Sequence, residues 1–201
     1  MLDKPTGDWR AERREAARAE ILRVAGQLAR EHGLAGLSLR DLARRLGMAA
    51  PSLYSYFESK NALYDAMFTE GWQTLLDLPQ PDPDPDLRTS LRRSTHAYVR
   101  WALEDPVRYQ LLNQRTIPGF EPSPEAYAVA QRAYEHVLAP LRALVDLTQE
   151  DLDLLTALVG GLINQQIANE PGGTRWVGLV DDAMDLYAQW LRARATTTPA
   201  A

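Results

Sequence analysis

The sequence of 201 residues contains no cysteine and only three histidines. Without cysteine, the chain cannot form disulfides, iron–sulfur clusters or cysteine-ligated zinc sites, and it cannot use a thiol in catalysis. Long apolar runs are also missing, since none approaches the ~20 residues of a membrane-spanning helix. The polar N-terminal stretch MLDKPTGDWRAERREAAR has no apolar core of the kind that a secretory signal needs. These absences predict a soluble cytoplasmic protein without a membrane partner.

Sequence motifs of catalytic and metal sites are missing as well. His32, His96 and His136 lie far apart, and none has the spacing of a zinc motif such as H-E-x-x-H. There is no glycine-rich phosphate loop and no G-x-S-x-G nucleophile motif. The sequence therefore predicts no catalytic residue, no metal and no cofactor. An all-α enzyme without a recognisable motif remains an alternative.

Positive charge is scarce on average but unevenly distributed. The net charge is −5, which argues against nucleic-acid binding. Residues 1–60, however, carry eleven Lys and Arg against eight Asp and Glu, a net charge of +3, while residues 61–201 have a net charge of −8. A basic N-terminal segment suits a DNA-binding surface, although charged clusters on helices also occur simply as solvated surface.

The apolar residues repeat with helical periodicity along nearly the whole chain, and no segment has a strand pattern. Ser38, Ser59 and Thr148 are expected as helix N-caps, with Asp41 and Asp151 completing capping boxes. The sequence predicts an all-α fold of about nine helices. Their expected ranges are 9–32, 39–46, 51–57, 60–76, 87–104, 106–115, 123–145, 149–169 and 174–194.

A proline-rich stretch, PQPDPDPD at residues 79–86, separates two helical regions. Its four prolines favour an extended conformation and its aspartates keep it solvated. We expect an N-terminal DNA-binding domain at residues 1–60, a larger helical ligand-binding and dimerisation domain at 61–196, and a tail at 197–201.

The second and third expected helices have the lengths and the intervening turn of a helix-turn-helix, over about residues 38–57. Ala43 and Gly47 are small enough to let the two helices approach closely. The apolar side chains that would form the underside of the motif are Leu39, Leu42, Leu46, Leu53 and Phe57. Spacing alone is equally compatible with a plain helical hairpin.

The residues of this motif resemble the signature of the tetracycline-repressor (TetR) family. The resemblance rests on SLRDLA at residues 38–43, GMAAPSLYSYFESK at 47–60 and Ala62-Leu63, and it covers about residues 15–75. Two positions depart from the family pattern: Ala29 stands where Phe is frequent, and Ala49 where Ser is frequent. The resemblance implies a helix-turn-helix transcriptional regulator, expected to be a repressor, with double-stranded operator DNA as its partner.

In such a regulator the third helix enters the major groove and its N-terminal part reads base edges. Ser52 and Ser55 could hydrogen-bond to bases, whereas Ala50 and Pro51 could contact thymine methyl groups. Tyr56 and Lys60 are expected at phosphates, which position the protein without reading sequence. The full predicted DNA-binding set is Ser38, Arg40, Ala50, Pro51, Ser52, Tyr54, Ser55, Tyr56 and Lys60.

Four arginines, Arg10, Arg13, Arg14 and Arg18, lie at the start of the first expected helix. They could form a basic arm that reaches the minor groove. Because Glu12 and Glu15 are interleaved with them, a solvated surface is the other interpretation.

The last two expected helices have wide apolar faces, which can pack both within the chain and against a second copy. A single helix-turn-helix also buries too little DNA for high specificity, and the family resemblance implies dimerisation through the same helices. We therefore expect a homodimer. The predicted interface residues are Leu155, Leu158, Leu162, Trp176, Val180, Ala183, Tyr187 and Trp190.

The family resemblance also implies a small-molecule effector bound between helices of the second region. Aromatic side chains there are more often core than ligand contacts, whereas buried amides need hydrogen-bond partners. The candidates are Trp72, Tyr98, Trp101, Tyr109, Asn113, Gln114, Asn164 and Gln165. A helical ligand-binding module with no DNA function is the second alternative.

Overall fold

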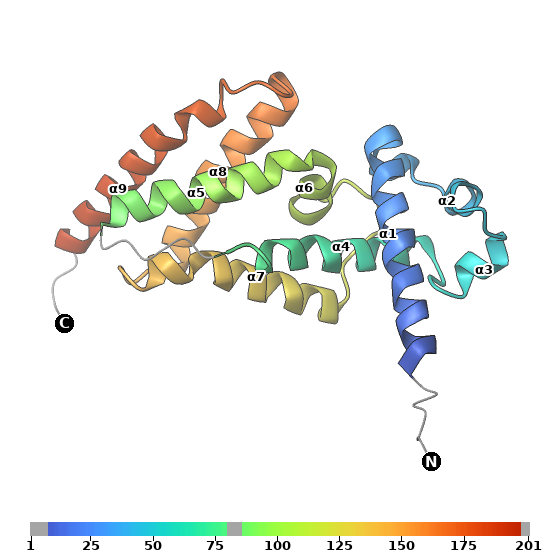
Figure 1. The fold of residues 1–201 in the computed structure, drawn as a ribbon. Coiled ribbons are helices and arrows are strands. Elements are labelled where there is room, and N and C mark those ends of the chain that lie inside the picture. The colour runs from blue at the N-terminus through green and yellow to red at the C-terminus, as the bar shows by residue number, and fades with distance from the viewer. Residues whose placement is uncertain (1–7, 80–85, 198–201) are drawn as a thin grey trace, which may run out of the picture. The chain divides into compact units, whose positions relative to one another are not determined.

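The computed structural model describes residues 8–79 and 86–197, which form nine α-helices and one 3-10 helix, η1, with no strand among them (Figure 1). The predicted all-α class is therefore confirmed. The elements are α1 (Asp8–Gly36), α2 (Leu39–Arg45), α3 (Ala50–Tyr54), α4 (Lys60–Leu76), α5 (Leu87–Glu104), α6 (Pro106–Asn113), α7 (Pro124–Arg142), α8 (Gln149–Asn169), η1 (Val177–Leu179) and α9 (Val180–Thr197).

The chain divides into two compact units. The head unit comprises residues up to 73 together with 107–130, and the body unit comprises 74–106 and the residues from 131 onward. The domain boundary expected at residue 60 remains a prediction, but the head unit extends beyond it into α4 and also includes α6.

The head unit is built around one apolar cluster. Ile21, Ala25 and Leu28 of α1 pack with Leu42, Leu53 and Phe57 of the α2–α3 region, and all are at most 3% exposed. Tyr64 of α4 lies in the same cluster and donates its hydroxyl to Leu34 O at 2.5 Å. Two helices as short as α2 and α3 would not be stable alone. The burial of their apolar side chains against α1 and α4 therefore holds them in place.

The body unit is centred on α5, α8 and α9. α5 and α9 lie side by side in opposite directions (Figure 1). Asp86, just before α5, pairs with Arg192 near the end of α9, whereas His96, farther along α5, pairs with Asp181 at the start of α9. Val180, Met184 and Tyr187 of α9 are at most 1% exposed. The inner face of α9 is therefore part of the core of this unit.

Several predicted helix ends are confirmed by local hydrogen bonds. Ser38 Oγ accepts from Asp41 N at 3.4 Å, Ser59 Oγ accepts from Ala62 N at 3.0 Å, and Thr148 forms the predicted capping box with Asp151. The ranges 60–76, 87–104 and 149–169 agree with α4, α5 and α8.

The first helix is interrupted at Gly33 as predicted, because this glycine is non-helical with φ 75° and ψ 161°; a short further helical segment extends the range of α1 to Gly36. Other expected ends are wrong. α3 ends at Tyr54, three residues early, and α7 ends at Arg142, just after Pro140. A proline inside a helix removes one backbone hydrogen bond and crowds the preceding turn.

The expected helix 174–194 begins late, at Val180. Gln166 Oε1 accepts from Trp176 N at 2.9 Å, and a Glu170 oxygen accepts from Arg175 N at 2.8 Å. These side chains of the preceding helix hold the turn before η1 in a non-helical path. Most of the proline-rich connector and of the expected tail falls outside the described residues.

Candidate DNA-binding site

The turn between α2 and α3 has the geometry of a helix-turn-helix. Gly47 adopts φ 65°, a left-handed conformation that suits glycine, and Met48 N then donates to Ala43 O at 2.9 Å. Ala43 is 3% exposed. Its small side chain lets the chain reverse tightly against the end of α2, which places α3 next to α2.

α3 separates its side chains into two sets. Leu53 and, just beyond the helix, Phe57 are buried in the head cluster, whereas Ala50, Pro51, Ser52, Tyr54 and Ser55 are exposed. Tyr54 is 50% exposed, so its ring is free to contact another molecule. The exposed set gathers five of the predicted DNA-binding residues on one short segment. Ser55 also uses its hydroxyl locally, because Ser55 Oγ donates to Ser52 O at 2.7 Å.

Two further predicted contacts interact within the head. Lys60 Nζ donates to Ala35 O at 3.1 Å and lies 5.4 Å from the centre of the Tyr64 ring. Tyr56 is half-buried beneath the guanidinium of Arg14, 5.2 Å from its ring centre. A cation at the C-terminus of α1 is favourable because that end carries partial negative charge. Lys60 and Tyr56 therefore have internal roles in addition to any contact with DNA.

Ser38 and Arg40 lie at the start of α2. Ser38 is half-buried and caps the helix, while Arg40 is exposed. Other basic side chains of the head are neutralised locally by ion pairs: Arg23–Glu20, Arg44–Asp41 and Arg45–Glu31. The hydrogen bond from Arg45 lowers the pKa of the Glu31 carboxyl. The surplus charge of the N-terminal segment is consequently available at only a few side chains.

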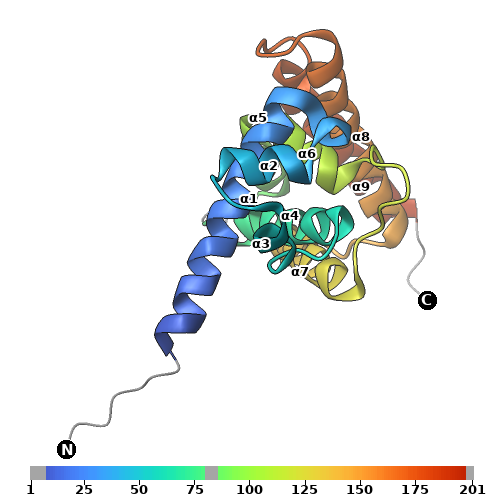
Figure 2. The ribbon, with the colours of Figure 1, turned by 90° about the vertical axis from the view of Figure 1, so that its right-hand side faces the viewer.

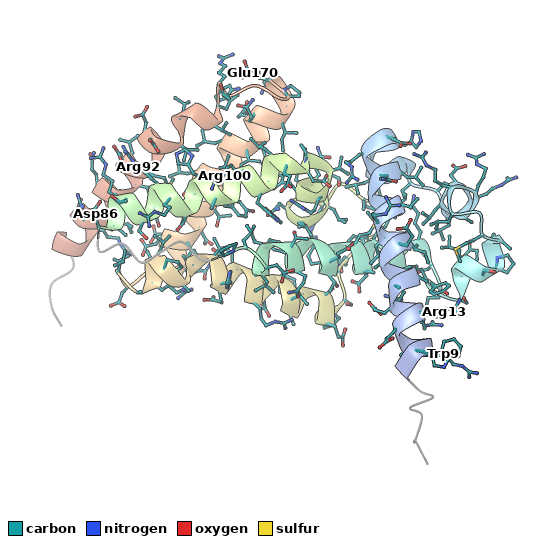
Figure 3. All side chains as sticks on the ribbon, viewed as in Figure 1. Trp9, Arg13, Asp86, Arg92, Arg100 and Glu170 are labelled. Carbon is teal, nitrogen blue, oxygen red and sulfur yellow. The ribbon has the colours of Figure 1, made fainter. Side chains whose placement is uncertain are left out.

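The four arginines at the start of α1 separate into two pairs. Arg14 Nη2 donates to Ser55 O and Arg18 Nη1 donates to Tyr56 O, both at 2.9 Å. Arg10 and Arg13 instead lie over the exposed ring of Trp9. Figure 3 shows Trp9 and Arg13 on the first turns of α1. Sequence reasoning treated all four alike, since a contact between residues about forty positions apart leaves no local signal.

The predicted dimer residues fall into two groups. Leu155, Val180 and Tyr187 are at most 8% exposed and pack within the body unit, so they are core residues. Leu158, Leu162, Trp176, Ala183 and Trp190 are half-buried. The most exposed large apolar residues of this region, Leu179 at 44% and Leu186 at 67%, belong to the wide apolar face of the last expected helix but are not in the predicted interface set.

The predicted ligand residues divide between the two units. Trp72, Tyr109, Asn113 and Gln114 belong to the head unit, while Tyr98, Trp101, Asn164 and Gln165 belong to the body unit. Asn164 and Gln165 are exposed, and the buried amide of this stretch is their neighbour Gln166, 1% exposed. Gln166 supports the turn before η1, as described above.

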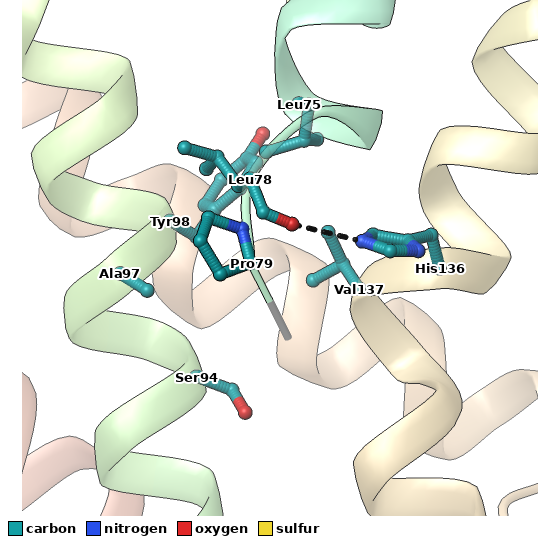
Figure 4. Close-up of a pocket in the computed structure, with 8 residues that line it drawn as sticks. All are labelled: Leu75, Leu78, Pro79, Ser94, Ala97, Tyr98, His136 and Val137. Atoms are coloured by element: carbon teal, nitrogen blue, oxygen red, sulfur yellow. Dashed lines mark hydrogen bonds between the residues drawn. The ribbon is translucent and has the colours of Figure 1, made fainter. Parts of the chain in front are cut away.

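Each unit contains a cavity that includes one or two of these candidates. In the head unit a cleft of about 370 Å³ is lined by Phe68, Leu111, Leu112, Asn113, Gln114, Arg115, Ile117, Phe120, Glu121, Pro122 and Tyr127. In the body unit a cavity of about 30 Å³ lies between Tyr98, Ser94 and Val137, and His136 Nε2 pairs with Leu78 O at its side (Figure 4). The smaller cavity has room for about one water molecule, whereas the larger has the size of a small-ligand site.

The described residues contain no group of three or more His, Asp or Glu that could hold a metal ion. None of the helices in residues 8–79 and 86–197 combines the length and apolar character that a membrane span requires.

Two family models match the chain. The model described as "Bacterial regulatory proteins, tetR family" matches residues 21–67, and that described as "Tetracyclin repressor-like, C-terminal domain" matches residues 91–189. The first match contains the whole α2–α3 motif, and the second contains all of α8 and most of α5 and α9.

Similar proteins include HTH-type transcriptional regulator Mb1846 of Mycobacterium bovis, 31% identical over 123 residues, which are 59% of this chain and 53% of that protein. The tetracycline repressor protein class C of Escherichia coli is 36% identical over 41% of this chain and 38% of the repressor. The chain thus spans about half, or less, of the length of these curated relatives.

Solved structures share the fold over a larger part of the chain. The regulatory protein SCO4313 aligns with a TM-score of 0.69 at 20% identity, over 89% of this chain and 98% of that one. A TetR variant of Acinetobacter baumannii in complex with minocycline aligns with a TM-score of 0.53 at 21% identity, over 95% and 99% of the two chains. At these identities the likeness concerns the fold alone.

Proposed function

Since the chain belongs to the TetR family of bacterial regulatory proteins, we propose that it is a homodimeric repressor that binds operator DNA and releases it when a small molecule binds. Members of this family are helix-turn-helix transcriptional regulators and not enzymes, so the alternative of an all-α enzyme is set aside. Because the partner is DNA, we propose that the protein acts in the cytoplasm.

The observation that carries this proposal is the exposed side of α3. Ala50, Pro51, Ser52 and Tyr54 point away from a core that holds Leu53. A helix held in this way can enter the major groove, where Ser52 can hydrogen-bond to a base edge and Ala50 and Pro51 can contact thymine methyl groups. With so few hydrogen-bonding side chains, part of the specificity would come from DNA shape.

Two heads are needed for high specificity, and the outer faces of α8 and α9 are suited to join them. On α8, Ala157 and Gly161 are exposed, and each is followed by a half-buried leucine, Leu158 and Leu162. A Cβ built at Gly161 of α8 would meet no atom within 4 Å. On α9, Leu186 is exposed. These small and apolar residues would let the same helices of a second copy approach closely, which would offset the cost of a mid-helix glycine.

The head-unit cleft is the effector site that the structure supports best. Its apolar lining offers burial, while Asn113, Gln114, Arg115 and Glu121 supply polar groups that could fix the orientation of a ligand. Leu111 contributes both to this cleft and to the core cluster of α1–α3. A ligand in the cleft would therefore touch a residue that also supports the DNA-binding helices, which is a route for a shift in population between two forms of the head.

The test of DNA reading is selection of bound duplexes from a random DNA pool, followed by affinity measurements on the selected operator. A dimer should select two related half-sites about 34 Å apart, or a multiple of that distance. Ser52→Ala and Tyr54→Ala should weaken operator binding with the fold intact, whereas Leu144→Ala, at an exposed apolar residue of the body unit, should not. No enrichment of any sequence would refute the proposal.

The effector is tested by the melting temperature of the protein against a panel of small metabolites, since a ligand that binds only the folded state raises it. A compound that raises the melting temperature of the wild type should not raise that of Phe120→Ala. The same compound should lower the affinity of the wild type for its operator. A reporter gene under the selected operator distinguishes repression from activation.

A further inference from the structure

α3 is too short to hold its own orientation. It has five residues, and its N-cap, Ala49, makes no side-chain capping bond. Isolated helices of this length are not stable in water, because one turn fixes several backbone angles for few hydrogen bonds. The angle of α3 must therefore be set by contacts with the rest of the head unit.

Two side chains of α1 supply such contacts at the C-terminal end of α3. Arg14 Nη2 donates to Ser55 O and Arg18 Nη1 donates to Tyr56 O, each at 2.9 Å. The guanidinium of Arg18 also lies 4.5 Å from the centre of the Phe57 ring. Residues four apart lie on one face of a helix, so the two arginines hold consecutive carbonyl groups from one side.

These carbonyls lie just past the last residue of α3, because Ser55 is its C-cap and Tyr56 follows. The C-terminal end of a helix carries partial negative charge, so a cation is favourable there. Charge-assisted hydrogen bonds from guanidinium groups satisfy these carbonyls and are stronger than neutral ones. Phe57 is 2% exposed, so Arg18 also ties this end of α3 to a residue that is fixed in the core.

We propose that Arg14 and Arg18 are positioning residues of the DNA-binding site, which hold α3 at the angle that its exposed side chains need to reach base edges. They act through α3 and not as phosphate contacts. The proposal rests on the proposed function of α3 as the element that reads DNA.

Arg10 and Arg13 provide a matched control. They lie on the same helix and carry the same charge, but their guanidinium groups lie over Trp9, 5.3 and 5.6 Å from its ring centre. Arg10→Gln combined with Arg13→Gln therefore removes positive charge from α1 while leaving the contacts to Ser55 and Tyr56 in place.

The two roles differ in their dependence on salt and on DNA sequence. An arginine that neutralises a phosphate releases counterions, so its loss lowers the slope of log affinity against log salt by about 0.9 and weakens binding to all sequences. A positioning residue contributes no phosphate contact. Its loss tilts or loosens α3, which weakens binding to the operator and leaves binding to unrelated DNA unchanged.

The experiment measures the affinity of the full chain for the selected operator and for a scrambled duplex, between about 50 and 200 mM salt. We expect Arg14→Gln and Arg18→Gln each to lower operator affinity about tenfold, with scrambled-DNA affinity and salt slope unchanged and the helices still folded by circular dichroism. Arg18→Lys keeps a charged donor and should restore part of the loss. In the free protein, amide exchange at Tyr56 and Phe57 should become faster in the two Gln variants.

A fall in salt slope of about 0.9, with equal weakening on both duplexes, would assign the two arginines to phosphates and overturn the proposal. So would unchanged operator affinity, or an equal loss of sequence preference in the Arg10/Arg13 control. Ser52→Ala separates this failure from failure of the proposed function. If Ser52→Ala also leaves sequence preference intact, α3 is not the reading element.

Discussion

Leu186→Ala should weaken the homodimer strongly while leaving the folded monomer intact. Leu186 is 67% exposed in the single chain, on the outer face of α9. Replacing Leu by Ala removes three carbons, which are worth about 2.4 kcal/mol when fully buried at ~0.8 kcal/mol each. If the interface covers the two-thirds now exposed, each copy loses about 1.6 kcal/mol.

A twofold interface contains every substitution twice. The dimer should therefore lose about 3 kcal/mol, and its dissociation constant should rise by about two orders of magnitude. Sedimentation equilibrium over a range of protein concentrations measures this constant directly. Circular dichroism of the variant checks that the helices remain folded.

Leu144→Ala is the matched control, because Leu144 is also an exposed leucine of the body unit, at 37%, but lies after α7 and outside α8 and α9. Its dissociation constant should stay within about threefold of the wild type, since surface substitutions outside an interface change little. If Leu186→Ala behaves like Leu144→Ala, the outer face of α9 does not join the two copies and the reasoning fails.

Three further predictions concern single residues. Gly47→Ala should lower the free energy of unfolding by about 1–2 kcal/mol, measured by urea titration, because the turn requires φ 65° there. Gln166→Ala should lower the melting temperature, since it leaves the backbone N–H groups of Trp176 and Val177 unpaired, which costs about 1–3 kcal/mol for each group. Gln165→Ala, at an exposed amide, should leave the melting temperature unchanged. Asp185→Asn should reduce stability at pH 7 and reduce it less at pH 3. Hydrogen bonds from Arg88, and then from a second arginine of α5, hold the pKa of Asp185 below its ordinary value. Its contribution is therefore present above the unfolded pKa of about 4 and is lost as the pH falls through the folded pKa. Equal destabilisation at both pH values would contradict this reasoning.

The helices and the turn of the helix-turn-helix could be predicted from the sequence because their signals are local. Ser38 and Ser59 cap helices through bonds to residues three positions ahead, and Gly47 supplies a backbone conformation that other residues rarely adopt. Leu53 and Phe57 alternate with exposed residues at helical spacing. Each of these features is decided by neighbours in the chain, so a single sequence reveals it.

The positions that were predicted less well depend on residues far away in the sequence. Periodicity marks the wide apolar face of α9, but it cannot say which part of that face packs inside; Tyr187 is 1% exposed while its neighbour Leu186 is 67% exposed. In the stretch Asn164–Gln166 the sequence shows three adjacent amides, and only packing against the turn before η1 identifies Gln166 as the buried one.

By itself the sequence determined the all-α class, several helix caps and the segment whose exposed residues we propose to read DNA, because these follow from interactions within one or two helical turns. The tertiary structure alone decided the use of the N-terminal arginines. Arg14 and Arg18 reach carbonyl groups about forty residues away, while Arg10 and Arg13 remain at Trp9. Arginines at neighbouring positions of α1 can thus either bind backbone carbonyls after α3 or lie at the exposed Trp9, because the angle at which each side chain leaves the helix determines what it contacts.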